Sequence, residues 1–103
     1  MKRGEIWWAN MPLPAGRRPV VLVSREAAYV VRASVTVVEV STRSRGIASE
    51  VPLGRRDGLP KSCVINADNV VTIPKTWLDA SIAPLRPDKL EALDAALRFS
   101  LGL

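Results

Sequence analysis

The 103-residue chain contains no histidine and only one cysteine. Without histidine there can be no Ser-His-Asp or Cys-His catalytic centre and no histidine-ligated metal site. Cys63 has no partner for an internal disulfide, and in the apolar run Cys63–Ile65 we expect it to pack as a small hydrophobic side chain. This cysteine usage is typical of cytoplasmic proteins. The chemistry open to the chain therefore depends on arginines, hydroxyls and carboxylates.

Long hydrophobic segments are also absent. The longest stretch without a charge, Ile6–Gly16, contains Asn10 and two prolines. A membrane-spanning helix needs about 20 apolar residues, so we expect none. The N-terminus meets Glu5 before any apolar region forms, which argues against a signal peptide. With 48% apolar residues, this length predicts a single folded domain over residues 1–103.

Positive charge is in excess and unevenly placed. The chain has 15 Lys+Arg against 10 Asp+Glu, a net charge of +5, and most of the cations are arginines. Residues 1–61 carry 11 positive and 5 negative side chains (net +6), whereas residues 62–103 carry 4 and 5 (net −1). The planar guanidinium matches phosphate geometry better than an ammonium does. The N-terminal part is therefore predicted to meet an anion such as a nucleic acid, although an ordinary solvated basic surface would show the same composition.

Short apolar runs separated by turn residues predict mainly β structure. We expect strands at Glu5–Met11, Pro19–Ser24, Val35–Ser41, Ser49–Leu53, Ser62–Ile65 and Val70–Ile73. Pro52 would confine the fourth of these to a sheet edge, because proline cannot donate to a strand ladder. Arg25–Tyr29 can form one helical turn.

The last part of the chain changes to helical periodicity. Pro87 and Asp88 suit the first turn of a helix, and Gly102 suits its end. A stripe of leucines lies between them at helical spacing: Leu90, Leu93, Leu97 and Leu101. Strands followed by a terminal helix predict a small β-barrel with a helix packed on it.

Two basic segments could bind phosphate. Arg17 and Arg18 precede Pro19 where a loop enters a buried strand, and the stiff proline would hold an arginine there in fixed geometry. The segment Ser41–Gly46 interleaves hydroxyls with Arg43 and Arg45 at the end of the third expected strand. Each segment alone is also compatible with an ordinary polar surface.

Asn66–Asn69 joins two apolar runs, and we expect it to form a hairpin turn because Asn and Asp bond their own backbone. The alternative is that Asp68 is a carboxylate near the basic site, able to accept a proton. Trp7, Trp8 and Trp77 could stack on bases or pack in the core. Trp7 and Trp8 must point to opposite faces of a strand, and we expect Trp77 to pack.

The chain resembles the MazF/PemK family of bacterial toxins. The resemblance runs in order through nearly the whole sequence and rests on Arg3–Trp7, Gly16–Ser24, Val40–Thr42, Glu50–Val51, Gly58–Leu59, Asp68–Ile73 and Ala96–Leu103. It implies a twisted antiparallel sheet curled like an SH3 barrel with a C-terminal helix. It also implies a homodimer, metal-independent endoribonuclease activity without a cofactor, and inhibition by a cognate acidic antitoxin.

The resemblance places the family's active-site arginine on Arg18 and its active-site threonine on Thr42, while Asp68 matches an acidic position that looks catalytic in some members. Arg17, Ser41, Arg43 and Arg45 are the expected RNA-binding residues. Two departures matter. The Pro12–Arg17 loop is short for a loop that commonly gates the RNA groove, and Asn66 stands where members with a catalytic aspartate can carry an arginine.

The expected mechanism uses the RNA's own 2′-OH as nucleophile. Arg18 would neutralise the phosphorane and Thr42 would donate to a non-bridging oxygen. The general base is open between Asp68, Glu26 and water. Two other functions compete: a non-enzymatic, CcdB-like toxin that binds a protein target, as gyrase-poisoning relatives of this barrel do, and a noncatalytic nucleic-acid-binding barrel.

Overall fold

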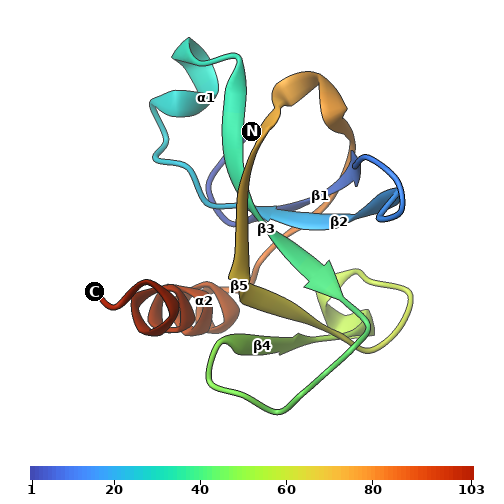
Figure 1. Ribbon diagram of the computed structural model, residues 1–103, viewed down its shortest axis with the longest axis vertical. Helices are drawn as coiled ribbons and strands as arrows, with labels where there is room; N and C mark the ends of the chain where they lie inside the picture. Colours follow the sequence, from blue (N-terminus) through green and yellow to red (C-terminus); the bar gives the residue numbers. More distant parts are fainter.

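One curled sheet of six antiparallel strands forms the frame of the molecule (Figure 1). The computed structural model describes residues 1–103. Its elements, in chain order, are β1 (Glu5–Asn10), β2 (Arg17–Leu22), α1 (Ala28–Val31), β3 (Ser34–Ser41), β4 (Glu50–Leu53), η1 (Arg55–Asp57), β5 (Cys63–Pro74), η2 (Lys75–Trp77), β6 (Leu78–Pro84) and α2 (Pro87–Leu101). The strand order is β4-β5-β3-β2-β1-β6, so β4 lies at an edge, as Pro52 predicts.

The sheet is buried on both faces. Val38 and Val40 of β3 belong to one cluster of buried side chains, the first core, which also includes Ile6, Val21 and Leu93. A second core lies on the other face: Ala9, Val20, Leu22, Tyr29, Val35, Val37 and Ile73. Because β3 serves both cores, its valines lie on both faces of the strand: Val38 and Val40 face the first core, and Val35 and Val37 face the second.

Helix α2 covers the first core. Leu93 and Ala96 are buried, and Leu90 and Leu97 pack beside them, as the leucine spacing predicts. The prediction for Leu101 is wrong, because this side chain is 56% exposed. Gly102 adopts φ 70°, and its N–H reaches the carbonyl of Arg98, which ends the helix at the expected residue. Neither helix of the molecule has the length and apolar character needed to span a membrane.

The hairpin predicted at Asn66–Asn69 does not form. Residues 63–74 are one continuous strand, β5, which bends sharply (Figure 1). Val38 pairs with Val70 and Val40 with Ile65, so the four residues Asn66–Asn69 lie opposite a single residue of β3. The N–H of Ala67 instead donates to the carbonyl of Ser49, at 2.8 Å. A bulge therefore replaces the turn, and it bends β5 so that one strand can pair with both β3 and β4.

The sequence does not reveal β6. Leu78–Pro84 contains Asp79, Ser81 and two alanines, which have low strand propensity, and its pairing with β1 shifts register twice. The segment forms a strand because its backbone pairs with β1, next to which it is the last strand of the sheet. Trp77, just before it, packs against the second core together with Trp7, as expected for Trp77.

Candidate active site

A cleft with a volume of about 270 Å³ lies where the start of β2 and the end of β3 meet. Arg17, Arg18, Ser41 and Thr42 line it, together with Trp8 and residues of the segment before β5. Val20 pairs with Glu39, and the same register continued by two residues places Arg18 opposite Ser41. The antiparallel pairing therefore brings together two segments that lie more than 20 residues apart (Figure 1, right-hand side).

Arg18 is the less exposed of the two arginines that line the cleft. Its Nη1 donates to Oε1 of Glu39 at 3.2 Å, and its side chain is 32% exposed. Its Nε is buried and has no hydrogen-bond partner. An unpaired buried donor costs about 1–3 kcal/mol. Glu39 thus holds one end of the guanidinium and leaves other donors free.

The sequence did not predict a role for Glu39 in the cleft. It is a single charged residue in the run Val37–Val40, and only the pairing of β2 with β3 brings it beside Arg18. A half-buried charge inside an apolar strand is the one signal that could have marked it, since such a group needs a partner.

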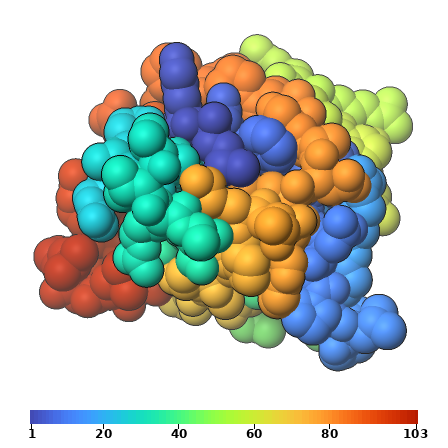
Figure 2. Space-filling model, turned by 90° about the horizontal axis from the view of Figure 1, so that it is seen from above, coloured from blue at the N-terminus to red at the C-terminus, as the bar shows by residue number.

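Arg17 points away from Arg18, because successive residues of a strand face opposite sides. Its guanidinium carbon lies 4.5 Å from the centroid of the Trp8 ring. Its Nε donates to Oδ2 of Asp79 at 2.8 Å. The adjoining loop between β1 and β2 is closed by a bond from the N–H of Met11 to the carbonyl of Gly16, and it projects from the body next to β6 (Figure 2).

The hydroxyl segment after β3 is only partly in the cleft. The Oγ of Ser41 accepts the N–H of Arg43 at 3.1 Å, which leaves its own proton free to donate. Thr42 is exposed in the cleft, whereas Arg43 and Arg45 do not line it. The carboxylate of Glu50 accepts the N–H groups of Arg45 and Gly46, so this loop has a defined shape.

Asp68 lies outside the cleft, on the bulge of β5. Its Oδ2 accepts the hydroxyl of Ser49 at 2.7 Å, and its Oδ1 accepts the hydroxyl of Ser100 at 2.8 Å. These two hydrogen bonds, from Ser49 first, lower the pKa of Asp68. The carboxylate links β5 to the buried start of β4 and to α2. Glu26, the other carboxylate considered as a base, accepts the N–H of Arg3 and does not line the cleft.

We expect Asp68→Asn to lower stability in a pH-dependent way. Because the pKa of Asp68 is lowered in the folded state, its contribution is fully present above the unfolded pKa of about 3.9 and is lost as pH falls through the lower folded pKa. Urea unfolding should therefore give a lower midpoint for the variant than for wild type at pH 7, with the gap closing below about pH 4. Glu91→Gln, at an exposed position of α2, is the control. A gap that is independent of pH would contradict this role.

Cys63 forms part of the cleft wall and is half-buried against the first core. Burial raises the pKa of its thiol, first of all, and the nearby Asp57 raises it further. A thiol of raised pKa is a poor nucleophile at neutral pH, which agrees with the expected packing role. No three His, Cys, Asp or Glu side chains lie close enough together to hold a metal ion.

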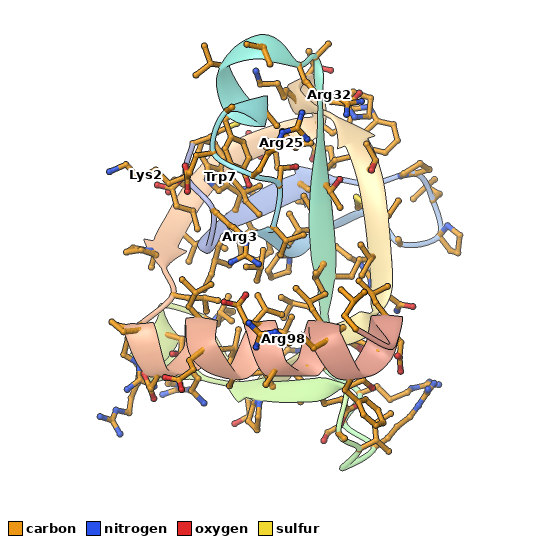
Figure 3. The ribbon with its side chains drawn as sticks, turned by 90° about the vertical axis from the view of Figure 1, so that its left-hand side faces the viewer. Lys2, Arg3, Trp7, Arg25, Arg32 and Arg98 are labelled. Atoms are coloured by element: carbon orange, nitrogen blue, oxygen red, sulfur yellow. The ribbon has the colours of Figure 1, made fainter.

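The cations of the N-terminal part do not all gather at the cleft. Figure 3 views the molecule from the left-hand side of Figure 1, away from the cleft, and shows four cations of residues 1–61 there: Lys2, Arg3, Arg25 and Arg32. Arg3 is neutralised by Asp94 at 2.7 Å. The charge excess of residues 1–61 is therefore divided between two sides of the molecule.

The comparisons with known proteins agree with this architecture. The family model described as "PemK-like, MazF-like toxin of type II toxin-antitoxin system" matches residues 2–101. A curated relative from Mycobacterium tuberculosis, named probable endoribonuclease MazF2, is 36% identical over 103 residues, which covers 99% of each chain.

Two solved structures share the fold over almost the whole chain. The M. tuberculosis toxin MazF-mt6 has a TM-score of 0.88 at 32% identity and covers 96% of this chain and 97% of its own. A mycobacterial endoribonuclease in complex with its cognate antitoxin has a TM-score of 0.88 at 30% identity and covers 100% of this chain and 96% of its own. Both the resemblance seen in the sequence and the predicted curled sheet with a C-terminal helix are confirmed. The chain belongs to the PemK-like, MazF-like toxins of type II toxin-antitoxin systems, the family of the endoribonucleases that it matches.

Proposed function

We propose that this endoribonuclease toxin cleaves single-stranded RNA without a metal ion, using the 2′-OH beside the scissile phosphate as nucleophile. The observation that carries the proposal is the meeting of Arg18 with Ser41 and Thr42 in one cleft, with the guanidinium anchored by Glu39. The cleft thus holds a fixed cation next to two hydroxyl donors, which is what a developing phosphorane requires.

Cleavage forms one bond at phosphorus and breaks another. The 2′-oxygen loses its proton and forms a bond to phosphorus, and the bond from phosphorus to the 5′-oxygen breaks. The products are a 2′,3′-cyclic phosphate and a 5′-OH. Arg18 stabilises the negative charge of the phosphorane, and Thr42 donates a hydrogen bond to a non-bridging oxygen, with Ser41 as a second donor.

The proton of the 2′-OH passes to water in this scheme, and water returns a proton to the leaving 5′-oxygen. Asp68 and Glu26 are both outside the cleft and engaged with other groups. We therefore assign Asp68 a structural role, linking β5 to α2. Arg43 and Arg45 are exposed on the loop shaped by Glu50, where they can contact phosphates that flank the cut.

The test is incubation of the purified protein with a single-stranded RNA in excess EDTA, followed by analysis of the ends. Cleavage with cyclic phosphate and 5′-OH ends is the expected result. No cleavage of any RNA would favour a CcdB-like, protein-directed toxin, or, if RNA is bound but left intact, a noncatalytic barrel. Loss of cleavage on adding EDTA alone would overturn the metal-free mechanism.

The proposed partners are a second copy of this chain and an acidic antitoxin. One matched mycobacterial endoribonuclease is described in complex with its cognate antitoxin. In this chain β4 and β6 are unpaired sheet edges, and Val30 and Val31 on α1 are 85% and 73% exposed. Self-association would cover apolar surface of this kind. Carboxylates of the antitoxin and phosphates of RNA would compete for the same guanidiniums.

We expect sedimentation at micromolar concentration to give twice the 11.2 kDa chain mass, and the antitoxin complex to lose RNA cleavage. Apolar anchors of the antitoxin should keep it bound at high salt, because screening weakens charge pairs more than apolar burial. A monomer, or a complex that cleaves RNA at the full rate, would count against this arrangement. Release of inhibition by salt alone would show that charge dominates the contact.

The proposed site of action is the cytoplasm, where mRNA is available. The first and second cores lie on opposite faces of the same sheet, which supports one domain over residues 1–103.

A further inference from the structure

We infer that Trp8, Arg17 and Asp79 form a subsite that stacks one RNA base next to the scissile phosphate. This inference rests on the proposed cleavage of RNA. It gives Arg17 a different role from the phosphate contact expected from the sequence. In the stack, Trp8 lies underneath, the Arg17 guanidinium lies over it, and the base binds on the exposed face of the guanidinium.

The geometry shows a preformed planar platform. The guanidinium carbon of Arg17 lies 4.5 Å from the Trp8 ring centroid. The bond from Arg17 Nε to Asp79 Oδ2, at 2.8 Å, holds the guanidinium from the side. The Arg17 side chain is nevertheless 47% exposed. A long arginine side chain that would otherwise sample many rotamers is thus fixed at two places, while one of its surfaces stays open to a ligand.

Charge argues for a base rather than a phosphate at this position. Arg17 is already paired with Asp79, whose side chain is 44% exposed. A phosphate that approached Arg17 would meet the repulsion of this carboxylate, whereas a neutral base would not. Bases stack on arginine planes and on aromatic rings in single-stranded RNA complexes. A planar platform with no net charge therefore fits a nucleobase.

The position of the platform determines which base it would bind. Trp8 and Arg17 line the same cleft as Arg18 and Thr42. Arg17 and Arg18 are consecutive on β2 and point to opposite sides of the strand, so one can hold a base while the other meets the phosphate. The base belongs to a nucleotide that adjoins the cut. Arg17 would touch it, and Trp8 and Asp79 would be positioning residues.

The decisive experiment compares Arg17→Lys with Arg17→Ala. Binding is measured with an RNA that carries 2′-deoxyribose at the cut, so that it stays intact, and with versions that lack one base on either side of the cut. In wild type, loss of the stacked base should weaken binding by roughly 5- to 150-fold. Arg17→Lys should bind the complete RNA as weakly as Arg17→Ala, because lysine keeps the charge but has no plane. Neither variant should lose much more affinity when the base is removed.

Three controls make the test specific. Arg32→Lys, at an exposed position away from the cleft, should behave like wild type. Trp8→Phe should retain most of the base-dependent affinity, and Trp8→Leu should lose it. Asp79→Asn and Trp8→Leu should raise KM for cleavage by the same factor as they weaken binding, with kcat within a few-fold of wild type.

The outcomes separate this inference from the proposed function. Wild type could cleave RNA with the expected ends while removal of the base weakens the binding of wild type and of every variant by the same factor. In that case the subsite is wrong and the cleavage proposal stands. Recovery of binding by Arg17→Lys, with a salt dependence equal to that of wild type, would show that Arg17 acts as a phosphate contact and would overturn the subsite. If wild type neither binds nor cleaves RNA, both fail.

Discussion

Replacing Arg18 by alanine should lower kcat for RNA cleavage by roughly 10²- to 10³-fold, the usual effect of removing one donor that stabilises transition-state charge. The guanidinium is held by Glu39, and its buried Nε has no partner in the protein. The anchored guanidinium lines the cleft, which indicates a group prepared for an anion there. Arg18→Lys should restore little, because an ammonium on a flexible stem cannot replace the planar fork.

The measurement is single-turnover cleavage at saturating enzyme, together with circular dichroism and thermal unfolding. Arg32→Ala removes an equally charged side chain away from the cleft and is the matched control. Cleavage at the wild-type rate by a folded Arg18→Ala protein would disprove the site. The cleavage rate of Glu39→Gln should lie between the rates of wild type and Arg18→Ala. Glutamine keeps a hydrogen-bond acceptor but holds the Arg18 guanidinium more weakly than a carboxylate does.

The same assay separates the two hydroxyls. Both Ser41 and Thr42 line the cleft, and each has a proton that it can donate to a phosphate oxygen. Thr42→Val removes the hydroxyl with little change in shape. Thr42→Val should lower the cleavage rate more than Ser41→Ala does if Thr42 is the main donor, as the resemblance to the family implies. The reverse order would move that role to Ser41 and leave the cleft itself unchanged.

Substituting hydrogen for the 2′-OH at the cut should stop cleavage completely, because the nucleophile itself is removed. The protein supplies a cation and hydroxyl donors in the cleft, so the attacking oxygen comes from the RNA in our proposal. Binding should be nearly unchanged, since the phosphates and bases remain. The expected result is an intact oligonucleotide that competes with the natural RNA at a similar concentration.

The control is an RNA with the same change one nucleotide away from the cut, which should still be cleaved. Cleavage of the RNA that lacks the 2′-OH at the cut would show that water attacks the phosphate, and the products would then carry no cyclic phosphate. Loss of binding, rather than of cleavage, would instead place the 2′-OH in recognition.

Local sequence patterns were sufficient to predict the elements with strong periodicity. The leucine spacing of α2, the apolar run of β3 and the position of Pro52 on an edge strand all follow from rules that act within a few residues. They fail at Asn66–Asn69, where these residues form a bulge instead of a turn, because β5 continues as one strand that pairs with β3 along one edge and with β4 along the other. They fail at β6 because its residues have little intrinsic preference for a strand.

The sequence by itself determined the type of chemistry and the family: arginines, hydroxyls and carboxylates without histidine, in an order that resembles the MazF/PemK toxins. Only the tertiary structure decided how these groups are paired. Glu39 meets Arg18, Asp79 meets Arg17, and Ser49 and Ser100 meet Asp68, at separations of 19 to 62 residues. Partners this distant are set by strand register and by the bend of β5. Both are determined by the packing of two cores on one sheet, because a shift of one residue would turn every apolar side chain to the wrong face.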